Sequence, residues 1–70
     1  MKFVLMLSLC SFVLGECKDP IKYPENFDTW KDCAIVALYT SVKYLESMDD
    51  ETVNQFQLST QYSCKLEDTI

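Results

Sequence analysis

The chain has 70 residues, six of them basic and eleven acidic, and therefore a net charge of −5 at neutral pH. Without histidine it lacks the commonest general base and the commonest metal ligand, and its few scattered lysines form no cationic patch for nucleic acid. We therefore expect a non-enzymatic protein that takes no metal or cofactor and binds no nucleic acid.

Residues 1–15 have the pattern of a secretory signal peptide. Lys2 supplies the positive start, a nearly unbroken apolar run follows, and Gly15 is the small residue at the cut. The apolar run of about 12 residues is shorter than the roughly 20 that a helix needs to span a bilayer. We expect cleavage after Gly15, which removes Cys10 and exports residues 16–70 to an oxidising, extracellular compartment without a membrane span.

Residues 16–28 carry both prolines of the chain, Pro20 and Pro24. Proline fixes φ and biases the residue before it toward extended geometry. This segment is therefore predicted to be an extended N-terminal arm, and residues 29–70 are predicted to form the folded domain.

A helix is predicted from about Trp30 to Ser47. Thr29 and Asp32 approximate a capping box at its start, and no glycine or proline interrupts the residues that follow. At 100° per residue, one apolar face includes Cys33, and a second apolar stripe with 3-4-3 spacing runs along another side. Two apolar faces indicate two neighbours, so the second stripe is a candidate interface. The stripe consists of Ile35, Leu38, Val42 and Leu45.

The segment after this helix has two interpretations. The three acids at 49–51 fit the start of a second helix, because acids oppose the positive end of the helix dipole. Residues 56–66 alternate apolar and polar, which favours a strand, but after cleavage the only candidate partner strand is the short arm with its prolines. A helix over about 51–65 satisfies its own backbone. We therefore predict an all-α fold, a small disulfide-stapled antiparallel helical hairpin over residues 29–70. The alternative is an α+β fold with residues 56–66 as a strand.

The cleaved chain keeps three cysteines, at positions 17, 33 and 64. In a hairpin that turns near residues 48–49, Cys33 and Cys64 are equidistant from the turn and face each other, so we predict a disulfide between them. Cys17 is then left unpaired or available for an intermolecular bond. An odd cysteine beside an uncovered apolar stripe suggests a disulfide-linked homodimer.

These observations predict a small, secreted, acidic, non-enzymatic protein that acts as an interaction ligand or effector of an unknown extracellular protein. One alternative is a carrier of a small apolar ligand, enclosed by a disulfide-linked dimer. Such a carrier resembles the secretoglobins, which are also small, helical, disulfide-paired and made with a signal peptide, and Cys17 matches their early cysteine; no residue role follows from this resemblance. Another alternative is a fragment of a longer secreted cysteine-rich domain.

Overall fold

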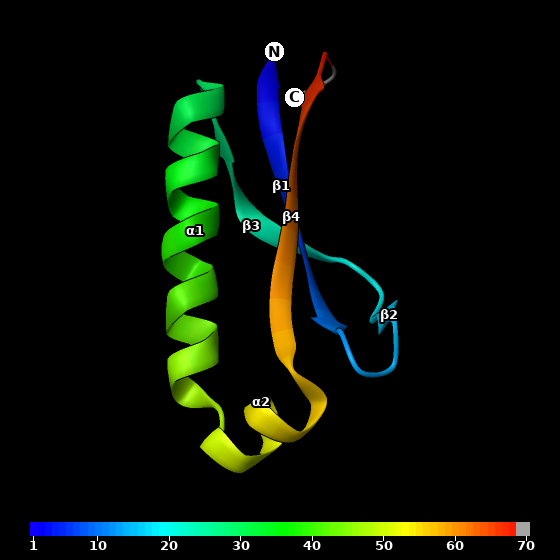
Figure 1. The fold of residues 1–70 in the computed structure, drawn as a ribbon. Coiled ribbons are helices and arrows are strands. Elements are labelled where there is room, and N and C mark those ends of the chain that lie inside the picture. Colours follow the sequence, from blue (N-terminus) through cyan, green and yellow to red (C-terminus); the bar gives the residue numbers. More distant parts are fainter. Residues whose placement is uncertain (69–70) are drawn as a thin grey trace.

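Four strands and two helices make up the computed structural model, which describes residues 1–68. In chain order they are β1 (Lys2–Ser11), β2 (Glu16–Cys17), β3 (Ile21–Phe27), α1 (Trp30–Ser47), α2 (Asp50–Phe56) and β4 (Leu58–Glu67). The strands form one antiparallel sheet, and α1 lies along one face of it (Figure 1). The fold is therefore mixed α and β.

Strand β1 is the centre of the sheet, since every other strand pairs with it. One edge of β1 pairs with β4 along its whole length, from Lys2 opposite Glu67 to Ser11 opposite Leu58. The other edge pairs with β3 and, further along, with β2. Because β1 has only two edges, β2 and β3 lie end to end on the edge opposite β4. Within residues 1–68, β4 has no other strand partner, so its outer edge is free.

The core lies between β1 and α1. Leu5, Cys33 and Ala37 are fully buried there. Partly buried hydrophobic residues from all three long strands pack around this cluster: Phe3, Leu7, Tyr23, Phe27, Tyr62 and Cys64, with Val36 from the helix. Alternate residues of β1 point toward α1, as the pleat of a strand requires.

Both helices begin as the sequence predicts. Helix α1 covers the predicted residues Trp30–Ser47, and the side chain of Thr29 accepts a hydrogen bond from the Asp32 amide at 3.1 Å. Asp49 caps α2 in the same way, accepting from the Thr52 amide at 3.4 Å. The acids at 49–51 thus serve the start of a helix, which confirms that interpretation.

The prediction of an all-α helical hairpin over residues 29–70 is wrong. Helix α2 ends at Phe56, and Gln57 turns the chain through a left-handed conformation with φ 50° into β4. The strand alternative for residues 56–66 describes this segment better. Its missing partner is β1, which the prediction had removed with the signal peptide. The predicted arm of residues 16–28 contains β2 and β3, and the likeness to the helical secretoglobins does not hold.

Residues 2–11 form β1 in the chain with its N-terminal segment attached. The central strand β1 is apolar at most of its positions, and the same composition is typical of the middle of a signal peptide. One apolar run therefore satisfies both patterns, and cleavage after Gly15 stays a prediction. Within the part of the chain that the structure describes, neither helix has the length and apolar character needed to cross a membrane.

Candidate functional site

Two disulfides pair all four cysteines. Cys33 and Cys64, the pair expected from the sequence, are joined, but the bond connects α1 to β4 rather than two helices. Cys17 is neither unpaired nor intermolecular: it is bonded to Cys10 across the turn between β1 and β2. This bond forms in the chain that keeps residues 1–15. The expectation of an unpaired or intermolecular Cys17 supposes that Cys10 is removed with these residues, and it stays a prediction together with that cleavage.

The predicted interface stripe is uncovered over most of its length. Ile35, Leu38 and Val42 are 54%, 57% and 52% exposed, and Leu45 is half-buried. Helix α1 instead buries the side that carries Cys33, Ala37 and Ser41. At 100° per residue the centre of the stripe lies about a third of a turn away from these buried residues. The stripe therefore runs along a flank of the helix, with Ile35 nearest to the outermost side.

The contacts on the other flank of α1 show which edge of the sheet, β3 or β4, lies nearer to the stripe. Thr40 and Tyr44, on that opposite flank, line a cavity together with Ile21 and Tyr23 of β3. The stripe must then lie on the side of β4. The exposed apolar side chains of the stripe are thus on the flank of α1 nearer to β4, and the outer edge of β4 is free within residues 1–68. We call this the α1–β4 surface, made of Ile35, Leu38, Val42, Leu45 and the outer edge of β4.

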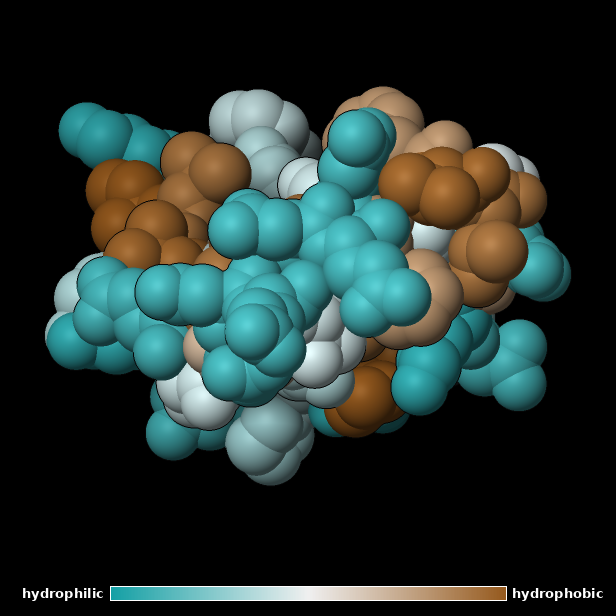
Figure 2. Space-filling model, turned by 60° about the horizontal axis from the view of Figure 1, so that its bottom comes forward, coloured by the Kyte–Doolittle hydropathy of each residue, from teal (hydrophilic) through white to brown (hydrophobic). Residues whose placement is uncertain are grey.

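Apolar side chains gather on two parts of the molecular surface. Figure 2 shows one apolar area on the left, over α1, and another on the right, over the turn between β1 and β2, with hydrophilic residues between them. The residues of the turn that account for the second area are Phe12, Val13 and Leu14. Exposed apolar side chains gathered in this way are unusual for a monomeric soluble protein and mark interaction sites.

A cavity of about 720 Å³ lies between α1 and the β1–β3 side of the sheet. A second cavity of about 590 Å³ adjoins it, and the two share Leu9, Cys17, Lys18 and Tyr44 in their walls. We call the pair the α1–β3 cavity. The first part is lined by Leu7, Ser8, Leu9, Cys17, Lys18, Asp19, Ile21, Lys22, Tyr23, Pro24, Thr40, Ser41, Tyr44 and Thr60.

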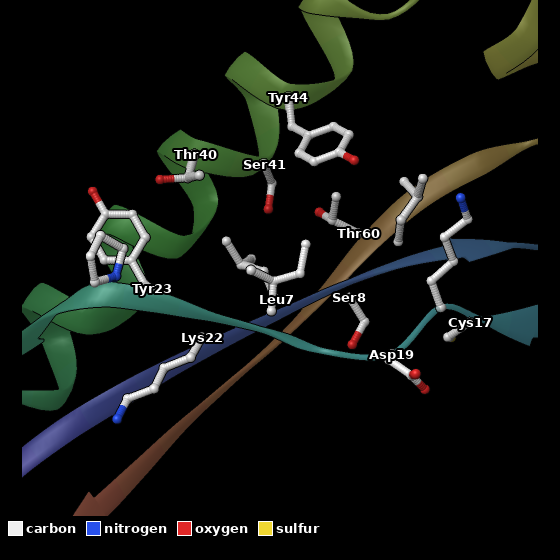
Figure 3. Close-up of a pocket in the computed structure, with 14 residues that line it drawn as sticks. Leu7, Ser8, Cys17, Asp19, Lys22, Tyr23, Thr40, Ser41, Tyr44 and Thr60 are labelled. Atoms are coloured by element: carbon white, nitrogen blue, oxygen red, sulfur yellow. The ribbon is translucent and has the colours of Figure 1, made fainter.

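The interior of this cavity presents few polar groups. Leu7 and Tyr44 extend into it, whereas the charged ends of Lys22 and Asp19 point away from α1 (Figure 3). The Ser41 hydroxyl donates to the Ala37 carbonyl at 2.8 Å and is therefore already engaged. An apolar molecule with few polar atoms matches this lining better than a charged one.

One ion pair joins the start of β1 to the turn before α1. The ammonium of Lys2 donates to the Asp28 carboxylate, and this hydrogen bond, with the attraction of the same ammonium, holds the pKa of Asp28 below its usual value. Within residues 1–68 no other ion pair is formed, and no three metal-ligating side chains gather.

Comparisons with protein-family models, with curated proteins and with solved structures found no match for this chain. Function must therefore be argued from the α1–β4 surface and the α1–β3 cavity themselves. Sequence reasoning identified the stripe through its helical spacing, but it missed the cavity, whose walls come from four strands and two helices. The signal that was available was the alternation of residues 56–66, which places Thr60 and Tyr62 on one face of a strand.

Proposed function

We propose that this protein is a secreted, non-enzymatic interaction protein that binds another extracellular protein through the α1–β4 surface. Two observations together carry the proposal: the exposure of Ile35, Leu38 and Val42 on α1, and the outer edge of the ten-residue strand β4, which pairs with no further strand within residues 1–68. An edge strand of this length readily pairs with another chain unless something blocks it.

The partner that fits this surface supplies an extended segment. Its backbone would pair with β4, and every second side chain would point toward α1 and pack on the stripe. Hydrogen bonds of the added strand would provide affinity, and the apolar contacts with Leu38 and Val42 would provide specificity. The two disulfides are consistent with an extracellular protein. The Cys33–Cys64 bond would hold α1 against β4 when the partner binds.

Paired aspartate variants test the proposal. Leu38→Asp places a charge in the middle of the stripe, whereas Tyr39→Asp places the same charge on the next residue of α1, which is also exposed but lies outside the stripe. Proteins captured from extracellular fluid by the oxidised full chain are purified and titrated individually. We expect Leu38→Asp to weaken binding at least about tenfold and Tyr39→Asp to leave it nearly unchanged.

Hydrogen exchange adds a second measurement on the same complex. Amides of β4 that point to its outer edge should exchange more slowly when the partner is bound. Equal loss of binding in both variants, or no protection of β4, would contradict the proposal. Protection of β4 in the protein alone, rising with its concentration, would assign the surface to a second copy of the chain instead.

The α1–β3 cavity supports a second candidate function, a carrier of one small apolar molecule. The first part of this cavity has a volume of about 720 Å³, which falls within the range of roughly 300–1,000 Å³ typical of ligand sites. A dimer linked through Cys17 is not part of this proposal, since Cys17 is bonded to Cys10 within the chain. A single chain would hold the ligand between α1 and β3.

A matched pair of strand variants tests the carrier function. Thr60→Phe fills the cavity from β4, while Gln61→Phe adds the same side chain on the opposite face of that strand. We expect a fluorescent fatty acid to bind the unmodified chain and Gln61→Phe with similar affinity and Thr60→Phe at least about tenfold more weakly. Unchanged binding by Thr60→Phe would place the probe elsewhere and exclude this site.

A further inference from the structure

The turn between β1 and β2, residues 12–15, joins the central strand to the rest of the chain. We infer that it is a proteolysis site of the folded protein, and that a cut there leaves the preceding residues in place as β1. The side chains of Phe12, Val13 and Leu14 are 74%, 55% and 59% exposed, and Gly15 has the left-handed φ of 70°. Exposed turn tips are where proteases cut folded domains.

The position of the Cys10–Cys17 disulfide decides what such a cut does. Every peptide bond of the turn lies between the two bonded cysteines. Hydrolysis adds one water across the cleaved bond and leaves a carboxylate on one residue and an ammonium on the next. No sulfur is oxidised or reduced, so the two pieces stay joined through the disulfide. Both new charges form at an exposed turn, where water solvates them.

Strand pairing then holds the N-terminal piece in its place. Strand β1 keeps its ladder with β4 from Lys2 to Ser11, and Leu5 remains fully buried under α1. The turn itself contributes one backbone hydrogen bond to another part of the chain, from the Phe12 amide to the Gln57 carbonyl at 3.2 Å. Cutting it therefore disturbs little of the fold.

The same geometry applies to the bond that the sequence predicts to be cleaved. The Gly15–Glu16 bond lies inside the Cys10–Cys17 loop. Cleavage of this bond in the folded, oxidised chain yields a two-chain protein rather than loss of residues 1–15. A cleavable N-terminal segment and a sheet built around that segment are thus compatible in one molecule.

Limited digestion of the oxidised full chain with chymotrypsin tests the inference. This protease cuts after large apolar residues, and Phe12 and Leu14 lie in a turn, whereas Trp30 and Tyr39 lie in α1, which must unwind to be cut. We expect the first cut within residues 12–15. The product should gain the mass of one water, remain one species without reductant, separate into two peptides with reductant, and keep its circular dichroism spectrum.

Two variants make the test specific. Phe12→Asp combined with Leu14→Asp should remove the early cut, and Cys10→Ser combined with Cys17→Ser should let the cut pieces separate in denaturant without reductant. A first cut in α1, β3 or β4 would overturn the inference. So would loss of the dichroism spectrum upon cleavage at the turn, or separation of the unmodified, unreduced pieces in denaturant.

Discussion

Leu5 lies directly opposite Cys64 in the pairing of β1 with β4, and Cys64 carries the disulfide to Cys33 of α1. Leu5 and Cys33 are both fully buried. The central strand, an edge strand and the long helix thus meet at one point of the core. Burial of apolar side chains and a covalent bond coincide there, and both stabilise the fold.

Replacing Leu5 should destabilise the protein strongly. Leu5→Ala removes a fully buried side chain and leaves a cavity between β1 and α1, which costs about 2–5 kcal/mol. Leu14→Ala is the matched control, because the same residue type is exposed in the turn and the change should cost less than about 0.5 kcal/mol. Urea unfolding of both variants measures the difference, and similar stabilities would show that residues 1–15 contribute no core.

The two disulfides should differ in their contribution. The loop closed by Cys33 and Cys64 has 32 residues and that closed by Cys10 and Cys17 has 8, counted from separations of 31 and 7. Chain entropy gives about 3.7 and about 2.5 kcal/mol for these loops. Double alanine variants of each pair, unfolded in urea, should preserve this order. The reverse order would mean that the unfolded chain retains structure across residues 33–64.

Gln57 occupies a position that favours glycine. Its φ of 50° is left-handed, and this conformation costs a residue with a β-carbon about 1 kcal/mol. We expect Gln57→Gly to stabilise the protein by up to that amount. Gln55→Gly, inside α2, should destabilise it by about 1 kcal/mol instead. Thermal unfolding of the two variants gives the signs, and destabilisation by both would contradict the left-handed turn.

The pKa of Asp28 reports whether β1 is in place. Lys2 lowers this pKa, so the ion pair stabilises the folded state above the usual aspartate pKa of about 3.9, and this contribution is lost as the pH falls through the lower folded value. In Lys2→Met the Asp28 carboxyl should titrate at higher pH, as measured by carbon NMR. An unchanged titration would show that the pair does not form in solution.

How much of the fold the sequence predicts depends on what each element needs from the rest of the chain. Helix α1, its cap Thr29 and the place of the acids at 49–51 at the start of a second helix were predicted correctly, because a helix and its caps are set by nearby residues. Strand β4 shows clear alternation, but a strand exists only with a partner. Assigning residues 1–15 to a signal peptide removed that partner, and the helix prediction for 51–65 followed from its absence.

Among the candidate sites, too, the sequence predicts those that depend on nearby residues and misses those that depend on distant ones. The stripe of Ile35, Leu38 and Val42 follows from helical spacing, and the structure leaves it exposed. The Cys10–Cys17 bond and the α1–β3 cavity depend on where β1 lies, and no local sequence pattern predicts the position of β1 in the sheet. An apolar run that fits a signal peptide can equally be a central strand. For a short chain, both interpretations should therefore be compared by the cysteine pairs that each one allows.

The two covalent loops, 10–17 and 33–64, neither overlap nor enclose one another. Between them, residues 18–32 are the sole covalent connection from the β1–β2 hairpin to the helices and β4. Opening the chain there would yield two internally cross-linked halves, joined by the ladder of β1 and β4 and by the packing of β1 against α1. Their reassembly would depend on concentration. If each half were fused to a different protein, reassembly would report that the two fused proteins are close together.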